Sequence, residues 1–80
     1  MTEYRDYLEF MCSVLERYYK GGQMLYETTE LVADIGLSSL QVMEFVEKIE
    51  DQFDISIPLN ILPDVNTLGD FARKLQELDT

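Results

Sequence analysis

Two adjacent serines, Ser38 and Ser39, are the residues whose type and position could support chemistry. They stand at the start of a helical pattern, and Ser38 has the S-x-x-Q spacing of a capping box with Gln41. Ser38 is therefore predicted to cap the helix, and Ser39 to be its first residue. The backbone N–H groups and the dipole at a helix start favour a phosphate, so a phosphodiester attached to the Ser39 hydroxyl would fit there.

The composition argues against a catalytic role for that hydroxyl. The chain of 80 residues has no histidine and a single cysteine, Cys12, which removes Ser-His and Cys-His pairs, disulfide frameworks and zinc sites of the usual spacing. No metal site is expected, since "DQFDISIP" lacks the glycine and the alternating oxygen ligands of a calcium loop. The protein is predicted to be a substrate that another enzyme modifies, and not itself an enzyme.

The charge is strongly negative, with 16 acidic and 6 basic residues and a net charge of −10. Nucleic acids and anionic membranes are poor partners for such a surface, and a basic protein surface is a good one. No apolar run is long enough to span a membrane, and "MTEYRDYLEF" does not resemble a secretory signal. We therefore expect a cytoplasmic monomer.

The elements that must position the serines are all predicted to be helical. A first helix is expected from Thr2, as its cap, to Tyr19, with Gly21-Gly22 as its stop. Its apolar spacing is carried by Tyr4, Tyr7, Leu8, Met11, Val14, Leu15 and Tyr18. A long loop from Gly21 to Leu37 follows, and its length suggests a function. Five apolar residues are expected to attach this loop to the core: Leu25, Leu31, Val32, Ile35 and Leu37.

The second helix is predicted to run from Ser39 to about Phe53, with Val42, Phe45, Val46, Ile49 and Phe53 as its buried stripe. "LNIL" makes at most one turn before Pro63, and Thr67 caps a last helix through a weak capping box with Asp70. The last helix buries Leu68, Phe71, Ala72, Leu75 and Leu78. The expected fold is a small all-α four-helix bundle, with three longer helices and one short one, forming a single domain over residues 1–80.

A helical wheel places Ser39, Leu40 and Met43 on the solvent side of the second helix. Two exposed apolar residues flank a hydroxyl there, and acidic residues surround them, which suggests a docking surface or an ordinary solvated face. The candidate docking residues are Leu40, Met43, Glu44, Glu47 and Glu50.

Three segments in register resemble the acyl carrier proteins: "LVADIGLSSL", "VMEFVEKIEDQFDISIP" and "VNTLGDFARKL". The resemblance covers about Leu31 to Leu75. It implies that Ser39, directly before the leucine, bears a 4'-phosphopantetheine arm that a phosphopantetheinyl transferase takes from coenzyme A. It also implies that acyl groups ride on the arm as thioesters, and that the acidic second helix docks on basic patches of acyl-loading and acyl-processing enzymes.

The resemblance leaves the cargo and pathway open between fatty acid, polyketide and related specialised biosynthesis. The family commonly has aspartate where this chain has Ser38, and this difference keeps a peptidyl or aminoacyl carrier of a nonribosomal synthetase as an alternative. Against that alternative, the second helix and the residue after it carry five acidic residues and one basic residue, Lys48; the acidic residues are Glu44, Glu47, Glu50, Asp51 and Asp54. From the residues alone, a noncovalent helical adaptor with both serines as caps is a further alternative.

Overall fold

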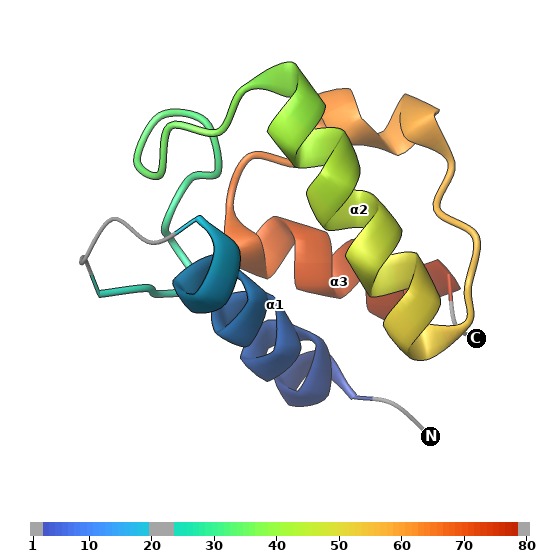
Figure 1. Ribbon diagram of the computed structural model, residues 1–80. Coiled ribbons are helices and arrows are strands. Elements are labelled where there is room, and N and C mark those ends of the chain that lie inside the picture. The colour runs from blue at the N-terminus through green and yellow to red at the C-terminus, as the bar shows by residue number, and fades with distance from the viewer. Residues whose placement is uncertain (1–2, 20–23, 79–80) are drawn as a thin grey trace.

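Four helices make up the fold in the computed structural model, which describes residues 3–19 and 24–78 (Figure 1). They are α1 (Tyr4–Tyr18), α2 (Ser39–Phe53), the 3-10 helix η1 (Leu59–Asp64) and α3 (Leu68–Leu78). Within the described ranges the only β-type pairing is an isolated bridge between Glu30 and Thr67. The predicted fold class, all-α with three longer helices and one short one, is confirmed.

The start of α1 differs from the prediction. Its N-cap is Glu3, and Asp6 Oδ2 accepts the Glu3 N–H at 3.0 Å. The predicted cap, Thr2, lies outside the described residues, but a helix that begins at Tyr4 is too far along the chain for Thr2 to cap it. An acid in the first turn closes the helix start instead, where the dipole favours negative charge. The predicted stop, Gly21-Gly22, also lies outside the described residues.

The predicted start and end of α2 are both confirmed. Ser38 Oγ accepts the Gln41 N–H at 3.2 Å, and Gln41 Oε1 accepts the Ser38 N–H at 2.9 Å. At the other end Asp54 adopts the left-handed conformation, with a φ of 55°. The chain then turns back, and Glu50 Oε2 accepts the N–H of Ile57 at 2.7 Å.

The turn predicted for "LNIL" is longer than expected, because η1 continues through Pro63 to Asp64. A proline in so short a 3-10 helix removes one backbone donor only, and the Val65 N–H still reaches the Leu62 carbonyl at 3.0 Å. The capping box at α3 is confirmed. Thr67 Oγ1 accepts the Asp70 N–H at 3.0 Å, and Asp70 Oδ2 accepts the Thr67 N–H at 3.2 Å.

The core lies where the apolar faces of the three long helices meet, and α1 packs chiefly against α3. Contacts between aromatic rings connect the helices. The ring centroids of Tyr7 on α1 and Phe53 on α2 lie 4.7 Å apart, and those of Phe45 on α2 and Phe71 on α3 lie 5.9 Å apart. The predicted stripes hold except at their ends, where Tyr18 is 57% and Leu78 is 36% exposed. Fully buried side chains are Tyr7, Met11, Phe45, Ile49, Leu68, Phe71, Ala72 and Leu75.

The segment before α2 is attached by its backbone to the start of α3. The N–H of Gly69 donates to the Glu27 carbonyl at 2.9 Å, that of Leu68 to Thr29 at 3.0 Å, and that of Leu31 to Asn66 at 3.0 Å. Figure 1 shows this segment passing beside the beginning of α3 before it rises to α2. The path of the chain into α2 is therefore set by contacts with a distant part of the sequence.

The predicted apolar attachments of this segment are confirmed except at one residue. Leu31 and Leu37 are buried, and Leu25 and Ile35 are partly buried against the core. Val32 was predicted to pack inward, but it is 66% exposed. The chain turns at this point, with the N–H groups of Asp34 and Ile35 both donating to the Glu30 carbonyl, so that Leu31 points inward and its neighbour outward.

Candidate functional site

Ser39 lies exposed as the first residue of α2. Ser38 Oγ accepts the N–H of Gln41, one of the backbone donors at the helix start that have no acceptor within the helix. Ser38 therefore caps the helix, and the Ser39 side chain is not needed for capping. The first N–H groups of a helix have no acceptor within the helix, and the dipole is positive there. The site can therefore seat a phosphate next to the Ser39 oxygen.

A groove of about 460 Å³ opens beside Ser39. Three elements form it: the turn before α2, the first turns of α2, and η1. Among the described residues that line it, Ser39 has the only polar side chain, and the others are Val32, Leu37, Val42, Met43, Leu59, Leu62 and Pro63. A group attached to a hydroxyl at the edge of an apolar groove can keep its polar part in water and place its apolar part in the groove.

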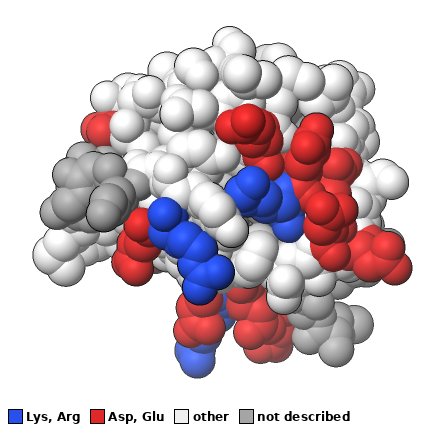
Figure 2. All heavy atoms as spheres, in the orientation of Figure 1, with Lys and Arg blue, Asp and Glu red and all other residues white. Residues whose placement is uncertain are grey.

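Four exposed apolar side chains surround the hydroxyl, and we call them the apolar rim: Val32, Leu40, Met43 and Leu59. They are 66%, 68%, 45% and 57% exposed, respectively. The prediction that Leu40 and Met43 face solvent is confirmed. Figure 2 shows an uncharged surface at the end of the molecule where α2 begins, with acidic side chains farther along. An exposed apolar cluster of this kind is typical of a surface that contacts other proteins.

The predicted acidic docking residues are placed differently from one another. Glu44 and Glu47 are exposed, whereas Glu50 is half-buried and one of its carboxylate oxygens accepts the Ile57 N–H. The Tyr19 hydroxyl lies 3.5 Å from Glu44 Oε1. Partial burial, with the neighbouring Glu44 carboxylate, raises the pKa of Tyr19. Glu44 and Glu47 can present their charges to a partner, while Glu50 also holds the turn after α2.

Two members of the apolar rim, Val32 and Leu59, were missed by the sequence analysis because they lie outside α2. They come from the turn before α2 and from η1, and only the fold brings them beside Ser39. A signal was present in "PLNIL", which has more apolar residues than one short turn can bury.

Among the described residues, none form a group of three or more histidine, cysteine, aspartate or glutamate side chains suited to a metal ion. No helix in the described ranges is both long enough and apolar enough to cross a membrane. Cys12 is a free thiol at the flank of the core, and burial raises its pKa.

Comparison with known proteins identifies the family. A family model described as the phosphopantetheine attachment site matches residues 8–75. An acyl carrier protein of Phenylobacterium zucineum is 31% identical over 64 residues, which cover 80% of this chain and 81% of that protein. A Caulobacter vibrioides protein named "Probable acyl carrier protein" is 43% identical over 47 residues, and the match covers 59% of this chain and 55% of that protein.

The fold gives the same result. A solved structure described as "a putative acyl carrier protein" from Mycobacterium tuberculosis matches with a TM-score of 0.77 and 25% identity, covering 86% of this chain and 93% of that one. The chain belongs to the acyl carrier protein family, whose members are phosphopantetheine-dependent carriers. Its cofactor is phosphopantetheine, and the exposed hydroxyl, the helix start and the apolar groove fit that group.

Proposed function

We propose that Ser39 is the residue that bears the 4'-phosphopantetheine arm, and that the protein carries acyl groups on it without catalysing a reaction itself. The observation that supports this most directly is the exposed Ser39 hydroxyl at the start of α2, with Ser38 as the separate cap. In the loading reaction the Ser39 oxygen bonds to phosphorus of coenzyme A, and adenosine 3',5'-bisphosphate leaves. The serine proton passes to a base of the phosphopantetheinyl transferase, since this chain has no histidine to accept it.

The groove beside Ser39 supports an acyl cargo with an apolar portion. Its lining is aliphatic apart from the serine, and each methylene that enters it is worth about 0.8 kcal/mol. Fatty acid, polyketide or related specialised biosynthesis supplies such intermediates as thioesters, and we propose that the chain serves one of these pathways in the cytoplasm. A monomer is proposed because a net charge of −10 opposes self-association.

The proposed docking face consists of Leu40, Met43, Glu44, Glu47 and Glu50. Leu40 and Met43 belong to the apolar rim beside Ser39, and the glutamates continue along the same helix. Basic patches on the transferase and on acyl-processing enzymes fit this face, because complementary charge accelerates encounter and sets orientation. The apolar rim then provides the close contact next to the hydroxyl.

Intact mass spectrometry tests the attachment residue. The purified protein is incubated with coenzyme A and a broad-range phosphopantetheinyl transferase. We expect wild type and Ser38→Ala to gain one phosphopantetheinyl group and Ser39→Ala to gain none. A wild-type protein that gains nothing would favour a noncovalent adaptor, and a gain on Ser39→Ala would place the arm elsewhere.

Transfer kinetics at low ionic strength test the docking face. The double variant Glu44→Lys/Glu47→Lys should lower kcat/KM of arm transfer roughly tenfold, and its rate should depend less on salt. The matched control Glu9→Lys/Glu16→Lys makes the same charge change on exposed residues of α1. Equal losses in the two variants would show that only net charge matters and would remove Glu44 and Glu47 from the face.

A further inference from the structure

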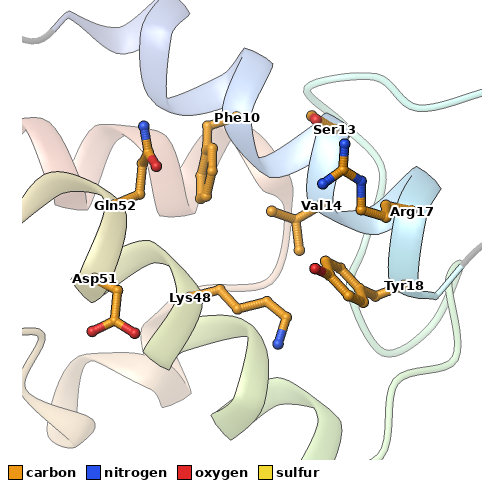
Figure 3. A pocket seen from close by; sticks show the side chains of 8 residues that line it. All are labelled: Phe10, Ser13, Val14, Arg17, Tyr18, Lys48, Asp51 and Gln52. Atoms are coloured by element: carbon orange, nitrogen blue, oxygen red, sulfur yellow. The ribbon is translucent and has the colours of Figure 1, made fainter.

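A second hollow lies between α1 and α2, away from Ser39, and we call it the α1–α2 groove. Its volume is about 340 Å³. It is lined from α1 by Phe10, Ser13, Val14, Arg17 and Tyr18, and from α2 by Lys48, Asp51 and Gln52. Figure 3 shows these side chains projecting from the facing sides of the two helices, with the Asp51 carboxylate directed away from α1. None of them belongs to the apolar rim or to the proposed docking residues.

Two basic side chains in this groove lack an acidic partner. Arg73 and Lys74 both form ion pairs within α3, whereas Arg17 and Lys48 form none with any residue that the structure describes. Lys48 Nζ lies 4.7 Å from the centre of the Tyr18 ring. This cation–π contact holds the lysine in position but leaves its positive charge in place. In a protein with so few basic residues, two unneutralised cations therefore share one groove.

The acidic and basic side chains lie toward opposite ends of the groove. Figure 3 shows Asp51 and Gln52 at one end and Arg17 and Tyr18 at the other, with the Lys48 amine directed toward the Tyr18 end. Phe10 and Val14 supply an apolar surface between the ends. The Tyr18 end thus offers positive charge beside an aromatic ring, which suits a carboxylate on a short aliphatic stem.

A carboxylate fixed to a partner protein suits this groove better than a free anion. The net charge of −10 repels small anions, and Figure 2 shows acidic side chains bordering the basic ones on this face. A partner that docks through a basic patch overcomes this repulsion and presents its own acidic residues at a high effective concentration. Lys48 lies one helical turn after Glu44 on α2, and the hydroxyl of Tyr19, the residue after Tyr18, lies 3.5 Å from Glu44 Oε1, so the groove borders the proposed docking face.

We propose that the Tyr18 end of the α1–α2 groove receives an aspartate or glutamate side chain of a partner enzyme, between Arg17 and Lys48. The partner surface would then combine a basic patch for Glu44 and Glu47 with one acidic residue beside it. The charges in the groove are the reverse of those on the docking face: here the carrier is positive and the partner is negative. A contact of each kind fixes the rotation of the partner about α2, which a uniformly acidic face cannot do. The proposal uses the proposed docking face to deliver the partner, but it does not require the arm on Ser39.

A glutamate scan of a basic peptide tests the groove directly. The probe is a helix-forming peptide of about twenty residues with lysines on one face and glutamine elsewhere, in which single glutamates replace each glutamine in turn. Dissociation constants are measured by fluorescence anisotropy at low ionic strength. Against so acidic a protein a glutamate should weaken binding at almost every position. At one or more adjacent positions we expect it to tighten binding roughly twofold to fivefold, as one partly exposed ion pair would.

Charge-matched variants assign that gain to the groove. In Arg17→Gln/Lys48→Gln the tightening should disappear, and in the control Arg5→Gln/Lys74→Gln it should remain. A scan in which no glutamate peptide binds more tightly than the glutamine parent overturns the proposal, as does a gain that survives in Arg17→Gln/Lys48→Gln. Failure of the attachment proposal is recognised separately, from the intact mass of the protein.

Discussion

Glu50 allows a sharp test of what the acidic residues of α2 do. Its Oε2 accepts the Ile57 N–H at 2.7 Å in a partly buried position. Glu47, three residues earlier on the helix, is exposed and accepts no such bond from any residue that the structure describes. Glu50→Ala removes a charge-assisted acceptor and leaves the amide of Ile57 without one. A bond of this kind contributes about 1.5–3 kcal/mol when fully buried, so partial exposure here suggests about 1–2 kcal/mol.

The corresponding shift in Tm can be estimated from the size of the chain. Unfolding entropy near 2.1 cal/mol/K per residue gives a chain of 80 residues a shift of about 6 °C for each kcal/mol. Glu50→Ala should therefore lower Tm by about 6–12 °C in thermal unfolding followed by circular dichroism at pH 7. The control Glu47→Ala removes the same charge from the same helix and should change stability by less than about 0.5 kcal/mol.

The comparison between the two variants decides the interpretation. If Glu50→Ala unfolds within about 2 °C of Glu47→Ala, the bond to Ile57 does not hold the turn after α2, and our reasoning about Glu50 is wrong. If the shift is as large as expected, a slower partner reaction in a Glu50 variant would reflect a loosened turn as well as lost docking charge. Glu44 and Glu47 would then be the cleaner residues for docking experiments.

Two further predictions concern helix ends. Asp54→Gly should raise stability by up to about 1 kcal/mol in chemical denaturation, because Asp54 has a φ of 55° and glycine adopts that conformation without strain; a loss of stability would contradict this. Backbone N–H groups of Thr67 and Asn66, with the Arg73 guanidinium, lower the pKa of Asp70. A lowered folded-state pKa gives stability that is present above the ordinary aspartate range and is lost as pH falls through the folded value. The stability difference between wild type and Asp70→Asn should therefore be largest near pH 7 and narrow in acid, and a difference independent of pH would refute it.

Sequence alone could predict what depends on neighbours along the chain. The capping box of Ser38 with Gln41 and the extent of α2 follow from local spacing, and both are confirmed. The predicted start of α1 was wrong because acidic residues can cap a helix as well as threonine can. Local rules do not decide whether Glu3 or Thr2 is the better cap. Local patterns therefore predicted where the helices lie more accurately than the residue at which each helix begins.

The sequence could not predict contacts between distant segments. Val32 reads as a core residue in an apolar run, and only the turn at Glu30 directs it outward to the apolar rim. The α1–α2 groove depends in the same way on the packing of two helices, which brings Arg17 and Lys48 into one hollow. Periodicity shows which face of each helix is apolar, but it does not show which charged residues at the borders of two faces will meet.

The backbone bonds between the segment before α2 and the start of α3 make the surroundings of Ser39 sensitive to remote substitutions. A Cβ added at Gly69 would stand 3.1 Å from the Glu27 carbonyl oxygen and 3.0 Å from the Tyr4 hydroxyl, which is itself bonded to the Glu27 side chain. Relieving that crowding would shift the segment that leads to Ser38. Natural variation at the beginning of α3 could thus retune how the hydroxyl is offered to partners, without any change in the residues that those partners touch.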